Sequence, residues 1–258
     1  MPPSPRVSIG GVPIDPLTLH EAILAIDLLV ASERGGAVFT PNVDHIVEFE
    51  RNPRLRQAYA AADLSLVDGM PVVWASRLLG RPLPEKVSGS DLIEPLLEHA
   101  RTRAWRVFFL GGQEGVGALA AARLKETMPA LSIVGTLAPR VDMTAPKERR
   151  ADIVEAIRAA RPQLVLVAFG APKQELWIHE AREALKPAVF LGIGASLDFI
   201  AGTLPRAPLW VSRSGFEWLY RLGREPRRLW KRYLLRDPRF LVILLRDLLG
   251  KNDGGASP

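Results

Sequence analysis

An aspartate, Asp68, stands directly after the apolar run of residues 64–67 and directly before Gly69. A carboxylate at the carboxyl end of a strand, beside a glycine that lets the backbone pass closely, is placed to face a ligand. There it could act as a general base. Alternatively, Asp68 caps a helix over residues 71–78, since Pro71 suits a first helical turn. The local sequence leaves both alternatives open.

Thr40 and Asn42 flank Pro41 at the end of another apolar run. Their hydroxyl and amide groups could hydrogen-bond a sugar, or they could cap a helix over residues 43–50. Taken alone, this short segment favours capping.

A glycine-rich turn beginning at Gly111 and Gly112 leads into a helix from Ala118. Backbone amides at such a helix start attract phosphate groups. The glycine spacing does not match the dinucleotide-binding fingerprint, so the signal by itself is weak. We favour a position near a bound nucleotide over a merely structural tight turn.

Two further strand ends carry polar residues. Gln174 follows Gly170-Ala171-Pro172-Lys173, and we expect it to project from a helix start, close to any phosphate bound there. Gly194 opens the next turn, and Asp198 follows it at a distance suited to a ribose hydroxyl. The alternative is that Gln174 and Asp198 are ordinary polar residues of a first helical turn.

The sequence offers few ligands to a metal ion. Its four histidines are scattered, cysteine is absent, and no Asp-x-Asp pair occurs. We therefore expect a metal-independent site without a cofactor, in which amide dipoles and cationic side chains balance the charge of a diphosphate.

These residues belong to an alternation of short apolar strands and helices, which predicts an α/β fold with a Rossmann-like, doubly wound, mostly parallel sheet. The expected strands are residues 37–39, 64–67, 107–110, 132–134, 164–169 and 189–193. The expected helices are residues 17–31, 53–61, 92–101, 115–128, 147–160 and 174–185. Because ligands bind at the carboxyl ends of such strands, their turns predict one cleft.

The pattern changes near Pro205, where helical and basic sequence begins. Residues 206–251 hold twelve Lys and Arg against four Asp and Glu, within a chain of net charge +6. We expect an α/β core over residues 1–204, a helical appendage over 205–251 and a disordered tail over 252–258. The mixture of leucine, aromatic and basic residues over 229–249 is typical of a helix lying at a membrane surface, although a helix docked on the core with solvated charges is the alternative.

Several motifs together resemble the TagA/WecG/CpsF family of glycosyltransferases. The motifs occur in the order typical of the family between about Val7 and Leu249, and the motifs together are specific for it. Its segments are Thr40-Pro41-Asn42, residues 66–75, 85–92, 170–175, 192–208, 215–222 and 225–229.

The resemblance implies an inverting transfer of a hexose or N-acetylhexosamine-type sugar from a UDP-sugar to a polyprenyl-diphosphate-linked saccharide, in the synthesis of a cell-surface polysaccharide. The donor implied by the resemblance is similar to UDP-N-acetylmannosamine, and a UDP-hexose or UDP-uronate donor is the alternative. The family's catalytic aspartate falls on Asp68, and its other site residues fall on Thr40, Asn42, Gln174 and Asp198.

One position departs from the family pattern. Lys86 stands where arginine is usual, and lysine keeps the charge but loses the bidentate fork that suits a diphosphate. We retain Lys86 as a phosphate-side residue. By resemblance, the basic appendage closes over the site and grips the acceptor diphosphate; its candidate residues are Arg206, Arg221, Arg228 and Lys231.

The N-terminal residues 1–14 lack a secretory signal and no apolar run approaches ~20 residues, so we expect a cytoplasmic protein at the inner face of the cell membrane. A homo-oligomer is compatible with the sequence. A nucleic-acid-binding protein is the alternative suggested by pI ≈ 10.0. Against it, the basic residues are interleaved with apolar ones and no recognition motif occurs. A nicotinamide-dependent enzyme would need the missing dinucleotide fingerprint.

Overall fold

We analysed a computed structural model of the chain, which describes residues 5–208, 211, 215–224 and 226–250. The predicted tail over 252–258 lies outside the described residues.

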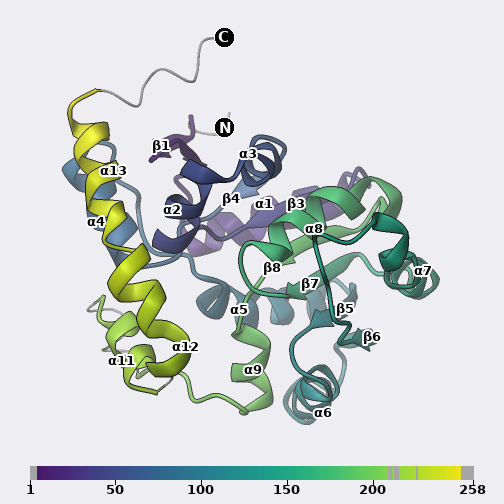
Figure 1. The fold of residues 1–258 in the computed structure, drawn as a ribbon. Coiled ribbons are helices and arrows are strands. Elements are labelled where there is room, and N and C mark those ends of the chain that lie inside the picture. Colours follow the sequence, from purple (N-terminus) through teal and green to yellow (C-terminus); the bar gives the residue numbers. More distant parts are fainter. Residues whose placement is uncertain (1–4, 209–210, 212–214, 225, 251–258) are drawn as a thin grey trace.

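A six-stranded parallel sheet forms the centre of the molecule (Figure 1). Its strands, in spatial order, are β4 (Leu64–Ser65), β3 (Gly36–Phe39), β8 (Val189–Gly192), β7 (Leu164–Ala168), β5 (Arg106–Gly111) and β6 (Ser132–Leu137). All six predicted strands are present, and β6 extends three residues beyond its predicted end. The α/β fold class is therefore confirmed.

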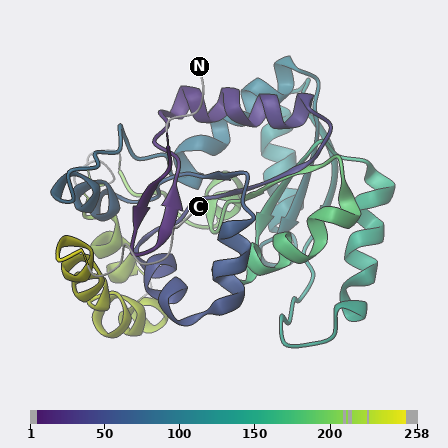
Figure 2. The same ribbon diagram turned by 90° about the horizontal axis from the view of Figure 1, so that it is seen from above.

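Helices cover both faces of this sheet, which explains why its strands are apolar on both sides (Figures 1 and 2). One face packs against α2 (Val43–Arg51), α3 (Pro53–Ala60), α4 (Met70–Leu78), α7 (Ala151–Ala160) and α8 (Lys173–Ala181). The other packs against α1 (Leu19–Ala31), α5 (Gly89–Thr102), α6 (Val116–Thr127) and α9 (Ser196–Ala201). The short turn η1 (Lys147–Arg150) precedes α7, and the short turn η2 (Arg182–Leu185) follows α8.

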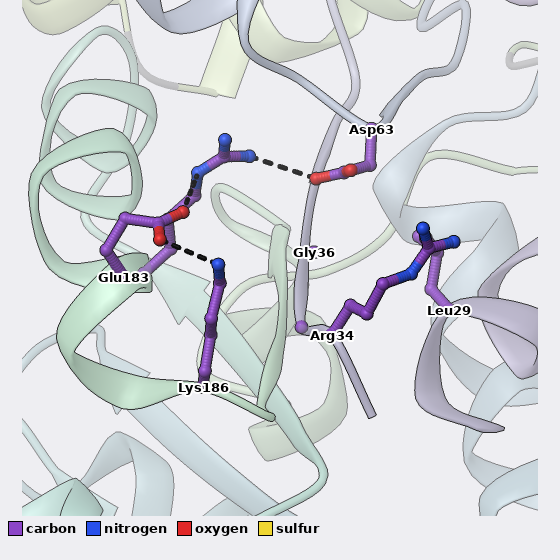
Figure 3. A pocket seen from close by; sticks show the side chains of 8 residues that line it. Leu29, Arg34, Gly36, Asp63, Glu183 and Lys186 are labelled. Atoms are coloured by element: carbon purple, nitrogen blue, oxygen red, sulfur yellow. Dashed lines mark hydrogen bonds and ion pairs between the residues drawn. The ribbon is translucent and has the colours of Figure 1, made fainter. Parts of the chain in front are cut away.

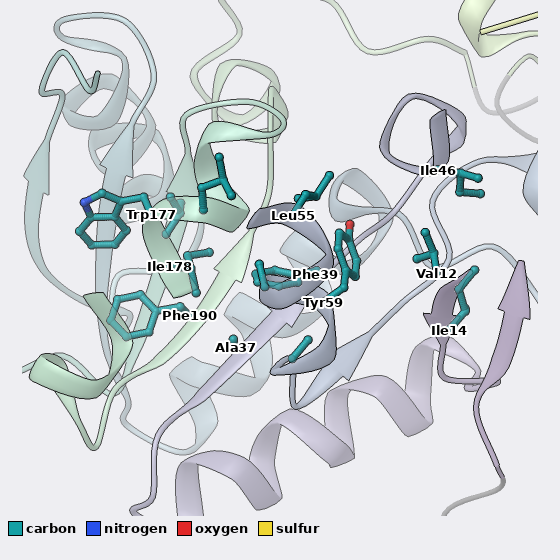
Figure 4. Close-up of a cluster of buried hydrophobic side chains, with 14 of the residues drawn as sticks. Val12, Ile14, Ala37, Phe39, Ile46, Leu55, Tyr59, Trp177, Ile178 and Phe190 are labelled. Carbon is teal, nitrogen blue, oxygen red and sulfur yellow. The ribbon is translucent and has the colours of Figure 1, made fainter. Parts of the chain in front are cut away.

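The first face is built around large aromatic side chains. Phe39 of β3 meets Tyr59 of α3 edge to face, with 5.2 Å between the ring centroids. Trp177 of α8 packs in the same manner on Phe190 of β8, at 6.0 Å (Figure 4). These contacts fix α3 and α8 against the neighbouring strands β3 and β8, and so fix the start of α8 at the carboxyl edge of the sheet.

A small antiparallel hairpin was not predicted from the sequence. It pairs β1 (Val7–Ile9) with β2 (Val12–Ile14). Gly10 and Gly11 form its two-residue turn with φ of +58° and +82°, the conformation that a tight hairpin of this kind requires. The glycine pair between short apolar runs was the available signal.

The described residues of the C-terminal appendage are helical and basic, as predicted. They form α11 (Glu217–Arg224), α12 (Pro226–Lys231), the π-helical turn η3 (Arg232–Arg236) and α13 (Arg239–Leu248). Helix α13 lies against α2 (Figure 1) and buries Phe240 and Ile243 there. The domain boundary between the core and the appendage, between residues 204 and 205, stays a prediction.

Acidic residues of α2 hold this appendage in place. Glu50 accepts hydrogen bonds from Arg239 and Arg246, and Glu48 accepts one from Arg236. The docked alternative is thus correct for part of the appendage, but these arginine charges are paired with α2 rather than merely solvated.

Candidate active site

The strand order places a crevice at the carboxyl edge of the sheet. The chain leaves β5 toward β6 and leaves β7 toward β8, which lie in opposite directions from the β5–β7 pair. The loops that follow these two strands therefore diverge, the arrangement in which α/β sheets bind nucleotides. Gly111 ends β5 and Gly112 opens the first of these loops, and Gly170 stands in the second.

A cavity of about 380 Å³ opens beside β3 and β4, between the core and the appendage. Four predicted site residues line it: Asn42, Asp68, Gly69 and Lys86. The appendage contributes aromatic and apolar surface together with three charged groups: Trp218, Tyr233, Phe240, Leu241, Glu217, Arg232 and Asp237. The cavity thus joins a polar core wall to an amphipathic appendage wall.

Asp68 does not cap the helix that follows it. Helix α4 begins at Met70 after Gly69, without a side-chain capping bond, so the capping alternative is wrong. The Asp68 amide instead donates to the Pro41 carbonyl at 2.9 Å, which ties the end of β4 to the loop after β3. This bond leaves the Asp68 carboxylate at the wall of the cavity.

Asn42 takes the capping role that the sequence favoured and also contacts Asp68, whereas its contact with a sugar stays a prediction. Its Oδ1 caps α2 by accepting from the amides of Asp44 and His45, at 3.1 and 3.4 Å. Its Nδ2 lies 3.5 Å from Oδ2 of Asp68, at the long limit of a hydrogen bond. Thr40 is buried instead, and its hydroxyl donates to the Gly192 carbonyl at 3.2 Å, which joins the ends of β3 and β8.

Lys86 lies in a small ion-pair network. Its Nζ is 2.8 Å from Oδ2 of Asp91 and 3.8 Å from Oε2 of Glu217 of the appendage. Arg206 also pairs with Asp91. Burial alone would raise the pKa of Asp91, but hydrogen bonds from Lys86 and Ser88 outweigh it and hold that pKa below its ordinary value. Asp91 therefore stays ionised and keeps Lys86 at the cavity wall.

The remaining core candidates lie outside the lining of this cavity. Gln174 is only 2% exposed and does not project from the helix start as expected, because its Oε1 accepts from the Gly194 amide at 3.1 Å. Asp198 stands in the first turn of α9 and accepts from the Thr203 hydroxyl at 3.2 Å. Their roles toward a donor stay predictions.

Of the appendage candidates, Lys231 is exposed and lies over the ring of Trp230, at 5.6 Å. The side chains of Arg221 and Arg228 lie outside the described part of the structure. Sequence reasoning missed Arg232, whose Nη2 lies 3.3 Å from Oδ1 of Asn42. Its spacing of four residues from Arg228, on one helical face, was the available signal.

Asp237, also missed, adds a titratable group to the cavity. Burial raises the pKa of this carboxyl to about 6, with Asp44 adding to the rise and Arg232 and Arg236 opposing it. The group therefore takes up a proton only slightly below neutral pH.

A second pocket, of about 230 Å³, lies at the opposite edge of the sheet (Figure 3). It adjoins Gly36, the first residue of β3, and is lined by Arg34, Asp63, Arg182 and Lys186. None of the predicted site residues reaches it, so the cavity beside Asp68 is the candidate active site.

The chain resembles known proteins along most of its length. The profile of the glycosyl transferase WecG/TagA/CpsF family matches residues 7–254. The chain belongs to this family. It is 36% identical over 213 residues to the N-acetylglucosaminyldiphosphoundecaprenol N-acetyl-beta-D-mannosaminyltransferase of Bacillus spizizenii, which covers 83% of this chain and 80% of that protein. This member of the family is accordingly a glycosyltransferase.

Proposed function

We propose that the enzyme transfers N-acetylmannosamine, with inversion, from UDP-N-acetylmannosamine to a polyprenyl-diphosphate-linked saccharide that serves the synthesis of a cell-envelope polysaccharide. The name of the Bacillus spizizenii relative supports the sugar and the lipid-linked acceptor. The observation that carries the proposal is the cavity wall at which Asp68, Asn42 and Lys86 converge.

In this reaction Asp68 is the general base. A sugar hydroxyl is a weak nucleophile at neutral pH, and a carboxylate that takes its proton assists the attack. The acceptor oxygen forms its bond to the anomeric carbon of the donor from the face opposite the diphosphate. The bond from that carbon to the diphosphate breaks, and UDP leaves with the electron pair. Asn42 donates to the carboxylate and so favours its ionised, proton-accepting form.

Negative charge develops on the diphosphate as this bond breaks, and the site offers cations to balance it. Lys86 lies on the core wall and Arg232 on the appendage wall. The loop after β5 leads into the start of α6, where the amides of a helix start favour phosphate. We assign the donor nucleotide to the crevice beside this loop and the acceptor diphosphate to the appendage side.

The direct test incubates the protein with a panel of UDP-sugars and a short-chain prenyl-diphosphate saccharide, followed by product masses. We expect transfer from UDP-N-acetylmannosamine with a β linkage by NMR. Transfer only from a UDP-hexose or a UDP-uronate would show that UDP-N-acetylmannosamine is not the donor. A retained anomeric configuration would contradict single-step attack assisted by Asp68. Salt-sensitive DNA binding without any UDP binding would favour the nucleic-acid alternative.

The surface of the appendage supports binding of the enzyme to the membrane surface. Among the described residues no helix is both long and apolar enough to cross a bilayer. Helix α13 nevertheless exposes leucines at spacings of four and three residues, namely Leu241, Leu245 and Leu248. Such a stripe beside basic residues suits the interface of an anionic leaflet, on the side where a lipid-linked acceptor lies. Oligomerisation stays a prediction.

Replacing both Leu245 and Leu248 with glutamine is expected to weaken binding to vesicles containing phosphatidylglycerol about tenfold or more, because each leucine contributes roughly 1.5–3 kcal/mol when fully buried. Vesicle sedimentation measures the loss. Leu28→Gln, on the exposed surface of α1, is the matched control and should bind as the wild type does. Equal binding by all three proteins would contradict membrane contact through α13.

A further inference from the structure

A line of buried hydrogen bonds runs from the loop after β8 to Asp68. The Gly194 amide donates to Gln174, and Gln174 Nε2 donates to Oε1 of Glu175 at 2.8 Å. The same oxygen lies 3.1 Å from Nε2 of His45. Nδ1 of His45 lies 2.8 Å from Oδ1 of Asn42, whose Nδ2 faces Asp68. His45 and Glu175 thus stand directly behind the proposed base.

The orientation of the Asn42 amide depends on these neighbours. Its Oδ1 is surrounded by donors: the amides of Asp44 and His45, Nη2 of Arg232 at 3.3 Å, and Nδ1 of His45. A carbonyl oxygen can accept from such groups, whereas an NH₂ group would oppose them. With the oxygen held on that side, the NH₂ group must point to the Asp68 carboxylate.

Two of the three contacts of the His45 ring call for two protons on it. In the third, the backbone N–H of Asn42 points to Nδ1 at 3.3 Å, longer than the 2.8 Å between Nδ1 and Oδ1 of Asn42. Glu175 Oε1 and Asn42 Oδ1 are both acceptors, and a neutral imidazole carries a single N–H. If Nδ1 lost its proton, two lone pairs would face each other across 2.8 Å. Burial lowers the pKa of His45, but the charge and hydrogen bond of Glu175 outweigh this, and the pKa is raised above its ordinary value.

The other elements around His45 leave this balance in place. Asp44 raises the pKa of His45 and Arg232 of the appendage lowers it. The ring of Tyr59 of α3 lies 6.5 Å from the imidazole, and burial together with Glu175 and Asp68 raises the pKa of this phenol, so it stays neutral. Within the described residues, Glu175 is therefore the main source of the His45 proton affinity.

We propose that His45 and Glu175 are positioning residues that hold the Asn42 amide toward Asp68, so that the reaction requires a protonated His45. The proposal rests on the proposed role of Asp68 as base. The proposal adds the buried pair of His45 and Glu175 to the residues on which catalysis depends. This pair lies outside the lining of the cavity in which we place the substrates.

The consequence is an alkaline limit on activity. Above the pKa of His45 its Nδ1 proton is lost, so that a lone pair instead of a donor faces Oδ1 of Asn42; the Asn42 amide is then held less well, and kcat/KM falls. The same titration affects stability with a definite sign: a histidine whose folded pKa is raised stabilises the protein fully below its unfolded pKa, and that contribution is lost as the pH rises through the folded pKa.

The test combines kinetics with NMR. Glu175→Gln removes the charge that supports the imidazolium and should move the alkaline limb of kcat/KM down by about one to three pH units. His45→Gln should abolish that limb and lower kcat roughly tenfold to a hundredfold, with the KM for the UDP-sugar little changed. The chain has only four histidines, so comparison with the His45→Gln spectrum identifies the imidazole signals of His45. Their titration in the wild type should coincide with the limb.

The matched control is Glu180→Gln on the same helix, which breaks the ion pairs with Arg54 and Arg150 but leaves His45 untouched. It should lower stability without moving the limb. An unchanged limb in a folded Glu175→Gln enzyme would overturn the proposal. If that variant does not fold, a wild-type limb that differs from the His45 titration overturns it. Full activity of Asp68→Asn would instead refute the proposed role of Asp68 as base, and absence of sugar transfer by the wild type would refute the proposed function, so these failures are distinguishable.

Discussion

The Asp68→Asn enzyme is expected to turn over about 10²–10⁴-fold more slowly than the wild type, the range by which a positioned general base typically accelerates a reaction. Asparagine keeps the size of the side chain but cannot accept the proton of the acceptor hydroxyl. The backbone bond from residue 68 to the Pro41 carbonyl does not involve the side chain and should persist. The variant should therefore fold normally and bind UDP with unchanged affinity.

Steady-state kinetics with the lipid-linked acceptor and calorimetry with UDP separate these two effects. Asp27→Asn is the matched control, because Asp27 is a carboxylate on α1 paired with Arg103, on the other face of the sheet. The control should keep full turnover. Near-normal turnover of Asp68→Asn would show that another group takes the proton, and Asp237, with its pKa of about 6 in the same cavity, would be the next residue to test.

Much of the core could be predicted because covered parallel strands must be apolar on both faces, and this pattern is visible in a single sequence. The meeting of Asn42 with Asp68 followed from the same reasoning. Each residue lies in the loop just after a strand, and the two strands are the neighbours β3 and β4. The local sequence favoured the cap, which Asn42 makes with its oxygen, but it could not show that the nitrogen of Asn42 faces Asp68.

The pair behind Asp68 could not be predicted in this way. His45 and Glu175 are separated by 130 residues and occupy the first turns of two different helices, where polar residues are ordinary. Only the packing of α2 beside α8 makes them partners. The expectation that Gln174 projects from its helix start was wrong for a related reason. A residue at a helix start can face solvent or the edge of the sheet, and Gln174 faces the sheet edge, where it accepts a hydrogen bond from the Gly194 amide.

The appendage shows a similar limit. Its basic composition indicated a charged surface, and the structure assigns part of that charge to internal docking, since Arg239 and Arg246 pair with Glu50. Acidic residues of α2 were ordinary surface positions in the sequence. The charge count therefore could not separate arginines that hold the appendage from basic residues that meet a membrane or an acceptor.

Gly111→Ala is expected to destabilise the protein by about 3–5 kcal/mol, the sum of backbone strain and overpacking. Gly111 ends β5 with φ of +101°, and a Cβ there would lie 2.7 Å from the backbone carbonyl group of Ala168 on the neighbouring strand β7. Neither backbone can move without breaking the β5–β7 pairing. Urea unfolding should show the loss as a midpoint lowered by about 1 M or more.

Gly115→Ala, in the same loop, is the matched control. Its φ is also positive, at +82°, but a Cβ there meets no atom within 4 Å, so the expected cost is only about 1–2 kcal/mol. Equal stability of the two variants would mean that β5 and β7 do not approach as closely as described. The pair also separates structure from donor binding: because Gly111 is required by the sheet, its loss says little about UDP, whereas weaker UDP binding by a stable Gly115→Ala enzyme would locate the donor diphosphate at the start of α6.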